Sequence, residues 1–433
     1  MKFFLLLIFF LFKFNTILSE DNLLFYIESA YKNNPRLNAE RKNLEAIKQN
    51  VNISRSEFLP SVTISGNKSG SQSTGKTNQA GDSLSDSSTN TESKTVSVDQ
   101  KIFQGFQGYN SLKKSNLEVK QANYELIKIE QKTILNSAEA YFDLIFKDKN
   151  KKFNIANKNI FERQVETDQA RLQKGEISLT DLAQSESSLA GANANMIIAD
   201  TELLTSKMNF ERITRVSIPE KINLTAKFNL KLPKNLSDAL KISNSQNPKL
   251  LIARVNYQIA DKDLNIEKSK ISPSASVNYS KTKNNDFNTT IDKVDQETVK
   301  ATVSWPLIKG GKNYSSVKKS KFKKEQSNLI LTDVENEIKT EVTNAWSIFQ
   351  SAEGVLRATE SQLQAAEIAN EGITLEYDSG STRTTLEVIQ SRSLLLNARI
   401  SQAKAVRDFT ISQFKLLEAI GDLTLENINS FKS

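Results

Sequence analysis

The chain has 433 residues, with 58 basic and 50 acidic side chains, and it contains no histidine and no cysteine. Their absence removes the commonest general base, the usual zinc ligands, thiol nucleophiles and disulfides, so catalysis is a weak expectation, although a carboxylate or Ser–Lys enzyme stays open. A hydrophobic content of 38% argues against a helical membrane protein. A net charge of +8 spread over this length indicates a solvated surface rather than a face that binds nucleic acid.

The first residues have the pattern of an export signal. Lys2 supplies a positive charge, and an unbroken apolar run covers residues 3–12. This run is too short for a comfortable transmembrane helix. We therefore expect a signal peptide over 1–19 that is cut near Ser19, with an uncleaved anchor as the alternative.

The rest of the chain contains an internal repeat, in which the same sequence pattern occurs twice. Residues 33–37 (NNPRL) return as 246–250 (QNPKL), and 102–105 (IFQG) return as 307–310 (LIKG). A repeat of this length is too long for a solenoid unit, so we expect two similar elongated halves. Their bounds are 20–215 and 235–424, with a linker over 216–234 and a C-terminal tail over 425–433.

Each half begins with a helix and continues with a β-hairpin. The helices are expected over 21–57 and 235–269, each ending before a proline. Apolar and polar residues then alternate, which predicts hairpins over 61–104 and 274–307. The predicted strands are 61–66, 95–104, 274–281 and 298–307, joined by polar loops over 67–94 and 282–297.

These hairpins are typical of an outer-membrane barrel. Four strands are too few for a soluble core beside so much helix, and an isolated two-stranded hairpin is marginally stable. Their alternation and their long polar loops match membrane-barrel strands. Because a closed barrel needs more strands than one chain supplies, copies of the chain would have to close the sheet together.

Long helices make up the remainder. No proline interrupts the chain from Gly105 to Gly175, and a continuous helix there would reach ~105 Å. Apolar residues recur every seven positions, which predicts coiled-coil packing: Leu182, Leu189, Met196, Leu203 and Phe210. We expect each half to contain a helical hairpin that reverses at a glycine, near 175 and near 380. An exported coiled-coil scaffold or adhesin without a channel is the alternative.

One motif points to a different class of protein. Residues 70–77 (GSQSTGKT) fit the P-loop pattern. A nucleotide site would need a helix to begin directly afterwards, whereas residues 78–83 continue as polar loop. We favour a chance match in a loop rich in Gly, Ser and Thr, and an exported ATPase stays open to a nucleotide-binding assay.

Several motifs in this order make the chain resemble the TolC-like outer-membrane efflux proteins over roughly 21–424. They are the helix–hairpin–long-helix plan stated twice, residues 140–144 (AYFDL), and two turn motifs at 171–182 (RLQKGEISLTDL) and 377–388 (YDSGSTRTTLEV). The resemblance implies an α+β membrane protein that forms a homotrimer. Each chain would give four strands to one twelve-stranded β-barrel in outer-membrane lipid, continuous with a long periplasmic α-helical coiled-coil barrel.

The resemblance also implies a function. The trimer would be a passive exit duct of a tripartite efflux pump or a type I secretion system in the outer membrane of a Gram-negative bacterium. It would not be an enzyme and would need no cofactor or metal. A periplasmic adaptor and an inner-membrane RND or ABC pump would open its periplasmic tip, and the cargo, whether drug, other small molecule or protein, is left open.

At the tip, the resemblance assigns a gate. Asp181 would bond Tyr377 between helix pairs, and Gln164 would bond Arg383, which would hold the inner coils closed. Arg383 is expected to be the more costly loss, because a guanidinium makes charged, multi-donor contacts. Ordinary polar residues on a coiled-coil surface are the alternative.

The resemblance assigns two further roles there. Glu387 and Gln390 occupy positions at which the family often has two aspartates that form the narrowest rings. We expect three Glu387 carboxylates near the axis to repel one another, which would raise their pKa values. Gly175, Glu176 and Gly380 would form the turns that the adaptor contacts.

Overall fold

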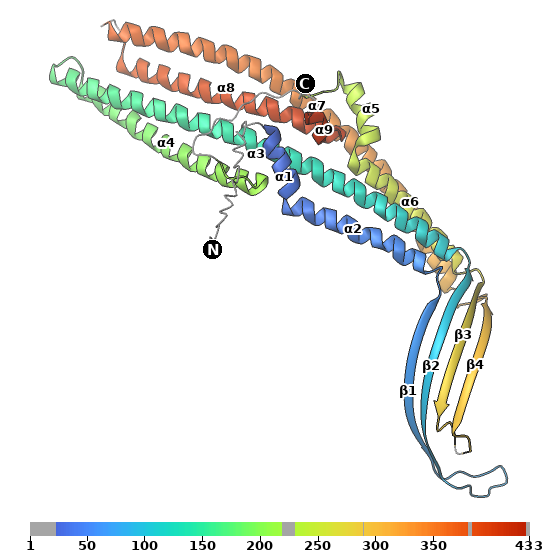
Figure 1. Ribbon diagram of the computed structural model, residues 1–433. Coiled ribbons are helices and arrows are strands. Elements are labelled where there is room, and N and C mark those ends of the chain that lie inside the picture. Colours follow the sequence, from blue (N-terminus) through green and yellow to red (C-terminus); the bar gives the residue numbers. More distant parts are fainter. Residues whose placement is uncertain (1–22, 219–229, 289, 380–382, 430–433) are drawn as a thin grey trace, which may run out of the picture.

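The protein is elongated, with a four-stranded sheet at one end and two helical hairpins that reach the other end (Figure 1). The computed structural model describes residues 23–218, 230–288, 290–379 and 383–429. The expected signal peptide and part of the expected linker lie outside these ranges. Within them, no helix combines the length and the apolar character needed to cross a bilayer.

The two halves match helix for helix. The short helices α1 and α5 have 11 residues each, α2 and α6 have 22, the long helices α3 and α7 have 67, and α4 and α8 have 36. Their bounds are α1 Leu23–Asn33, α2 Pro35–Ser56, α3 Gln107–Gln173 and α4 Leu179–Thr214 in the first half. In the second they are α5 Leu236–Gln246, α6 Pro248–Ser269, α7 Lys312–Asp378 and α8 Thr385–Ile420, and α9 (Leu425–Asn429) follows.

The helices expected over 21–57 and 235–269 are wrong as single elements, because each is two helices. The break falls at an Asn–Pro pair in both halves. Asn34 accepts hydrogen bonds from the backbone N–H groups of Arg36 and Leu37, so its side chain caps the start of α2. Pro35 and Pro248 occupy the first helical position, where the missing N–H costs no helical bond.

The strands run antiparallel in the order β1-β2-β3-β4 and are mostly longer than expected. They are β1 Ser61–Ser73, β2 Ser87–Gln104, β3 Ser274–Asn285 and β4 Lys293–Ser304. The expected strands were too short at their loop ends because the side chains there are polar on both faces, and the apolar alternation fades while the backbone ladder continues. Residues 70–73 of the P-loop match lie within β1, and a loop rather than a helix follows them.

The sheet has two chemically different faces. The apolar face carries valine, isoleucine, alanine and tyrosine side chains at alternate positions of the strands: Val62, Ile64, Val96, Val98, Ala275, Val277, Tyr279, Val299, Ala301 and Val303. Further along the strands this face carries ion pairs, Lys281 with Glu297 and Lys283 with Asp295. The other face, called here the polar face, carries hydroxyls and amides, and Thr95 bonds Thr282 across it at 3.0 Å.

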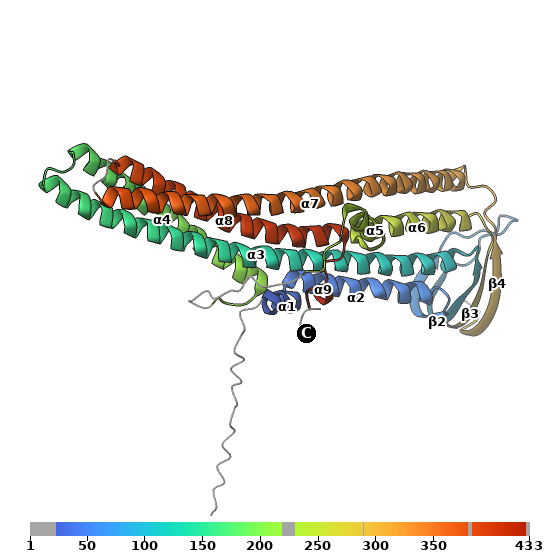
Figure 2. The ribbon, with the colours of Figure 1, turned by 90° about the horizontal axis from the view of Figure 1, so that it is seen from above.

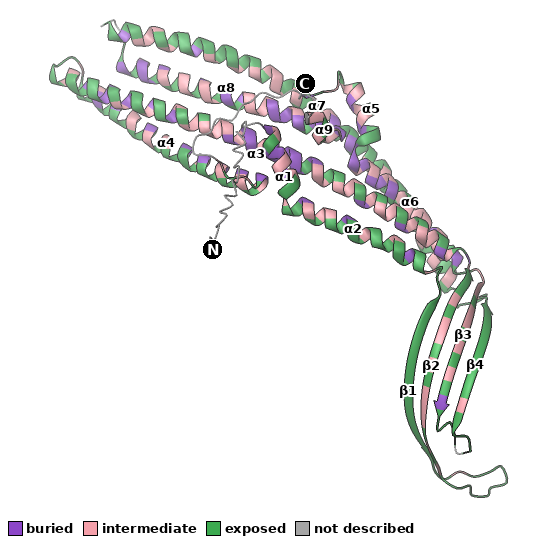
Figure 3. Cartoon of the chain, viewed as in Figure 1, coloured by how far each residue is buried: buried purple, intermediate pink, exposed green. Residues whose placement is uncertain are grey.

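The strand order continues into the helices. Beside the sheet, α2, α3, α6 and α7 lie side by side, and towards the far end α4, α3, α8 and α7 do so (Figure 2). Buried side chains gather where the two sets meet, as Figure 3 shows. An aromatic group there includes Tyr26 and Phe210, whose ring centroids are 4.9 Å apart. The edge strands β1 and β4 and most of α7 are exposed in the single chain.

Candidate functional site at the tip of the helical hairpins

The two helical hairpins reverse at the same end of the molecule, far from the sheet (Figure 1). The first turn joins α3 to α4 through residues 174–178. Gly175 has a φ of 73° there, its N–H donates to Leu172 O, and Glu176 N–H donates to Arg171 O, which together close a Schellman turn. Glu176 also pairs with Arg171 (Nε–Oε2 3.3 Å). Gly380, in the second turn, lies outside the described residues.

Each hairpin begins its second helix with the same capping arrangement. The Asp181 carboxylate accepts hydrogen bonds from the N–H and the hydroxyl of Ser178, and the Ser178 hydroxyl accepts from Asp181 N–H. Glu387 and Thr384 do the same at the start of α8. A capping box of this kind satisfies open N–H groups in the first helical turn.

The capping boxes bear on what was expected of the Asp181 and Glu387 carboxylates. The hydroxyl and backbone N–H of Ser178 hold the pKa of Asp181 below its ordinary value, and the hydrogen bonds of this carboxylate within the chain come from Ser178 rather than from Tyr377. For Glu387 the contacts within one chain act in the direction opposite to the rise that we expect from three carboxylates near the axis of a trimer. The Thr384 N–H and the Arg383 guanidinium lower the pKa of Glu387, because both stabilise the charged form.

A buried polar group links the two hairpins behind these caps. We call it the tip cluster, and it consists of Gln164 and Asp168 on α3, Ser185 on α4, Tyr377 on α7, and Thr385 and Arg392 on α8. The Asp168 side chain is fully buried. It accepts hydrogen bonds from Ser185 Oγ (2.5 Å), Gln164 Nε2 (2.9 Å) and Tyr377 Oη (3.4 Å).

Gln164 and Tyr377 make the contacts that cross between the hairpins. Gln164 Oε1 accepts a hydrogen bond from Arg392 Nη1 at 2.8 Å. The Tyr377 hydroxyl also lies 3.1 Å from the Thr385 hydroxyl, and the Arg171 guanidinium lies over the Tyr377 ring, 4.8 Å from its centroid. Burial lowers the pKa of Arg392, while the nearby carboxylates of Asp378 and Asp168 oppose that shift.

The two bonds expected from the sequence therefore have other partners within the chain. Tyr377 bonds Asp168 instead of Asp181, because the Asp181 carboxylate is used in its cap. Arg383 bonds Glu376 (2.6 Å) and Glu387 (3.0 Å) on its own hairpin, and Arg392 takes the place expected for it beside Gln164. Gln390 lies one turn after Glu387 and is exposed.

Asp168, Ser185, Thr385 and Arg392 were not predicted from the sequence. Asp168 lies seven residues after Phe161, and Ser185 lies seven before Ala192. Phe161 and Ala192 belong to a small apolar core, so these polar residues occupy the equivalent buried positions one heptad nearer the tip. A polar side chain in an apolar heptad position was the signal that could have revealed them.

Comparison with known proteins agrees with this architecture. The family model of the outer membrane efflux proteins matches residues 26–214 and 239–422, one segment in each half. The chain belongs to the outer membrane efflux protein family. Members of this family are channels of the outer membrane, so the helical hairpins of this member lie in the periplasm.

Two relatives and one structure illustrate the family. The chain is 26% identical to the outer membrane efflux protein BepC of Brucella suis, over 92% of this chain and 85% of BepC. It is 25% identical to the outer membrane protein TolC of Vibrio cholerae, over 94% of this chain and 92% of TolC. The fold is similar to that of the Campylobacter jejuni CmeC outer membrane channel, with a TM-score of 0.81 at 15% identity, covering 93% and 86% of the two chains.

Proposed function

We propose that three copies of this chain form a passive exit duct through the outer membrane. Four strands from each copy would close a twelve-stranded barrel, and the helices would continue it as a hollow coiled-coil barrel across the periplasm. The observation that carries this proposal is the sheet, which has one apolar face, one polar face and two open edges at β1 and β4. Such a sheet is stable in a bilayer only when its edges are paired.

The exposed surface of α7 supports the same assembly. Apolar side chains that are at least half exposed lie seven residues apart in three pairs along this helix: Phe322 and Leu329, Ile348 and Val355, Ile368 and Leu375. Within each pair this is the heptad spacing of a helix face that packs against another helix. Among the described elements, α7 packs against α5, α6 and α8, so these side chains are left for a neighbouring copy.

We assign the gate to the tip of the hairpins. The tip cluster would hold the α7–α8 hairpin against the α3–α4 hairpin in the closed duct, and Glu387 and Gln390 would line its narrowest part. A periplasmic adaptor would contact the turns at Gly175, Glu176 and Gly380, and an inner-membrane RND or ABC pump would supply the energy. We assign no catalytic residue and no cofactor, and we propose residues 1–19 as the export signal.

Conductance and surface labelling test this proposal. Purified protein should run as a heat-modifiable trimer and should form ion-conducting channels in planar bilayers. A cysteine placed at Ser85, in the loop over 74–86, should react with an impermeant reagent on intact cells. An exported scaffold or adhesin would form no channel, and the absence of labelling under conditions that label a known surface site would contradict the topology.

A further inference from the structure

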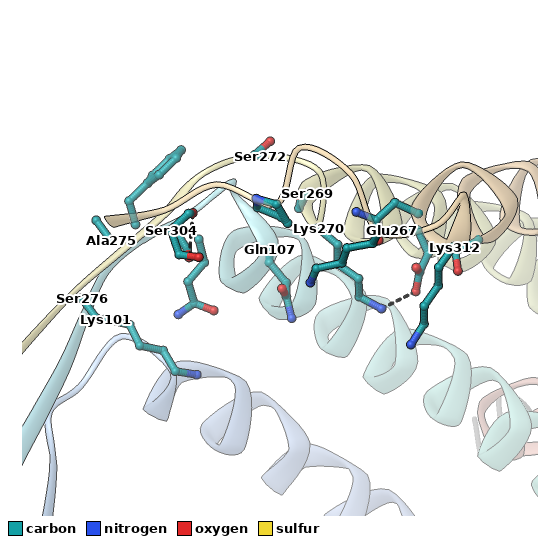
Figure 4. Close-up of a pocket in the computed structure, with 17 residues that line it drawn as sticks. Lys101, Gln107, Glu267, Ser269, Lys270, Ser272, Ala275, Ser276, Ser304 and Lys312 are labelled. Atoms are coloured by element: carbon teal, nitrogen blue, oxygen red, sulfur yellow. Dashed lines mark hydrogen bonds and ion pairs between the residues drawn. The ribbon is translucent and has the colours of Figure 1, made fainter. Parts of the chain in front are cut away.

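A cavity of about 720 Å³ lies where the sheet meets the helices. Its lysines come from separate parts of the chain: Lys101 from β2, Lys270 from the end of α6, Lys309 from the segment after β4, and Lys312 from the first turn of α7. In Figure 4, Lys101 reaches the cavity from the strands, and Lys270 and Lys312 reach it from the helices. We call this site the junction cavity.

The junction cavity has an excess of positive charge. Glu267 is the one carboxylate in its lining, and it pairs with Lys270 (Nζ–Oε1 2.6 Å). Lys101, Lys309 and Lys312 have no carboxylate within ion-pair distance among the described residues. Three unpaired ammonium groups around one cavity favour an anion, because no protein carboxylate neutralises them.

The start of α7 adds to the positive electrostatic potential in the junction cavity. Lys312 is its first residue, and Gly311 before it has a φ of 78° and supplies no side-chain cap. The first N–H groups of a helix carry partial positive charge. Gln107, the first residue of α3, also lines the cavity, and its helix likewise has no side-chain cap.

The two repeats build the site from equivalent positions. Gln104 and Gln107 of the first half correspond to Lys309 and Lys312 of the second, each at a shift of 309 − 104 = 312 − 107 = 205 residues. All four residues line the cavity. The second repeat therefore has lysine where the first has an uncharged hydrogen-bonding side chain.

Strand register indicates which side of the barrel the cavity faces. Lys101 pairs with Ser276, and two residues along Asp99 pairs with Asn278 and accepts its hydrogen bond on the polar face. Alternate residues of a strand share a face, so Lys101 and Ser276 also belong to the polar face. Because the apolar face must contact lipid, Lys101 and Ser276 place the charged side of the junction cavity towards the water-filled interior, and Ala275 of the apolar face also lines it.

We propose that the junction cavity is a binding site for small multivalent anions, bearing phosphate or carboxylate groups, inside the duct. This inference rests on the proposed function, because the polar face is the interior only in a closed barrel. In the trimer the site occurs three times at one level, where the bore passes from helices to strands. An anion in transit is held there before it enters the barrel.

Single-channel recording with tripolyphosphate as the probe tests the site. The wild-type channel should be blocked by tripolyphosphate, less strongly as the salt concentration rises, because salt screens exposed charges. The variant Lys101→Gln, Lys309→Gln, Lys312→Gln should need at least about tenfold more probe for the same block. Its reversal potential in a salt gradient should shift towards cation preference.

A matched variant removes the same charge elsewhere. Lys68→Gln, Lys94→Gln, Lys283→Gln changes three lysines near the loop ends of the strands, on the face opposite Lys101. It should be blocked like the wild type. Equal block of all three proteins, or equal loss of block in both variants, would overturn the site.

A second experiment tests whether the junction cavity binds the phosphate of a lipid headgroup instead of a soluble anion. Trimers from nanodiscs that contain phosphatidylglycerol are compared for retained lipid by native mass spectrometry. Wild type and the junction variant should retain equal amounts, and selective loss of lipid from the junction variant would place the cavity on the membrane side and overturn the proposal. A protein that forms no channel contradicts the proposed function, whereas a channel without anion block contradicts this inference alone.

Discussion

Asp168 is the residue on which the tip cluster depends. Its buried carboxylate accepts from three side chains on α3, α4 and α7, and hydrogen bonds to a charged group contribute about 1.5–3 kcal/mol each. Asp168→Asn removes the charge and replaces one acceptor oxygen with a donor. We expect a higher conductance in planar bilayers and a lower unfolding temperature. Glu166→Gln, a change at an exposed residue two positions away, should alter neither. An unchanged conductance in Asp168→Asn would show that the tip cluster does not hold the duct closed.

We expect the loss of Tyr377 to be more costly than the loss of Arg383, the reverse of the order expected from the sequence. The Tyr377 hydroxyl reaches the other hairpin, whereas Arg383 pairs with exposed Glu376 and Glu387 on its own hairpin. Exposed ion pairs contribute about 0–1 kcal/mol. Tyr377→Phe together with Arg383→Ser should raise single-channel conductance without loss of trimer, and Tyr377→Phe alone should give most of that rise. A rise that follows Arg383→Ser alone would favour contacts of Arg383 with a neighbouring copy.

Glu418 provides a prediction about pH. Burial raises the pKa of this α8 carboxyl above its ordinary value of 4.5; Lys132 opposes the shift, and Glu341 and Glu139 add to it. Since the folded state binds the proton more tightly, this stabilising contribution is complete below about pH 4.5 and is lost as the pH rises through the raised pKa. Glu418→Gln should therefore raise the unfolding temperature at pH 7 but not at pH 4. The exposed Glu371→Gln change is its control, and a gain that is equal at both pH values would contradict the assignment.

The sequence predicted which residues lie at the tip, but it did not predict their hydrogen-bond and ion-pair partners within the chain. Sequence motifs identified Gln164, Asp181, Tyr377, Arg383 and Glu387 as tip residues, and the structure brings all five to that end of the hairpins. Their partners depend on which carboxylate is already used by a helix cap. That choice depends on turn geometry, which spacing alone does not specify. Gate roles for these residues remain predictions.

At the scale of elements, the two Asn–Pro junctions form a natural matched pair. Asn34 and Asn247 both cap a helix, but Asn247 is buried and also donates from Nδ2 to Ala419 O at 2.8 Å. Gly421 is packed against it, since a Cβ there would lie 2.6 Å from Asn247 Cα. The second junction is therefore fastened to the end of α8.

Alanine substitutions test this difference. Asn34→Ala should cost about 0.5–2 kcal/mol of stability through the lost cap. Asn247→Ala should cost about 1–3 kcal/mol more, because it leaves the partly buried Ala419 carbonyl without its donor. Chemical denaturation of the two variants measures both values. Equal losses would show that the contact with Ala419 contributes nothing.

Helices and strands could be predicted where one sequence pattern is much stronger than any other. The long helices follow from the absence of proline and from heptad spacing, and the observed α3 differs from the expected span by two residues at each end. The strand ends and the helix breaks were missed for opposite reasons. Polar strand residues give no alternation to detect, whereas the Asn–Pro pairs carried a clear N-cap signal that the helical periodicity around them obscured.

At the scale of the whole molecule, the assembly follows from unsatisfied surfaces rather than from any motif. Because the chain has no cysteine, pairs of cysteines can be introduced and no native cysteine will form competing disulfides. Thr63→Cys in β1 combined with Thr298→Cys, Lys300→Cys or Thr302→Cys in β4 should give covalent dimers and trimers in at least one register. Products that extend beyond the trimer, or no product at all, would contradict a closed ring of three. Thr63→Cys with Ser280→Cys, in the interior strand β3, should give none.

The height of the apolar face has a consequence for the membrane. On β3 and β4 it covers alternate positions from Ala275 to Tyr279 and from Val303 to Val299, about 14 Å measured along the strands at ~3.4 Å per residue, before the ion pairs begin. Outer-membrane barrels commonly present a band about 25 Å tall. Such a hydrophobic mismatch thins the surrounding bilayer. Two ducts that share one thinned patch deform less lipid than two apart, so we expect these molecules to gather in the membrane without touching one another.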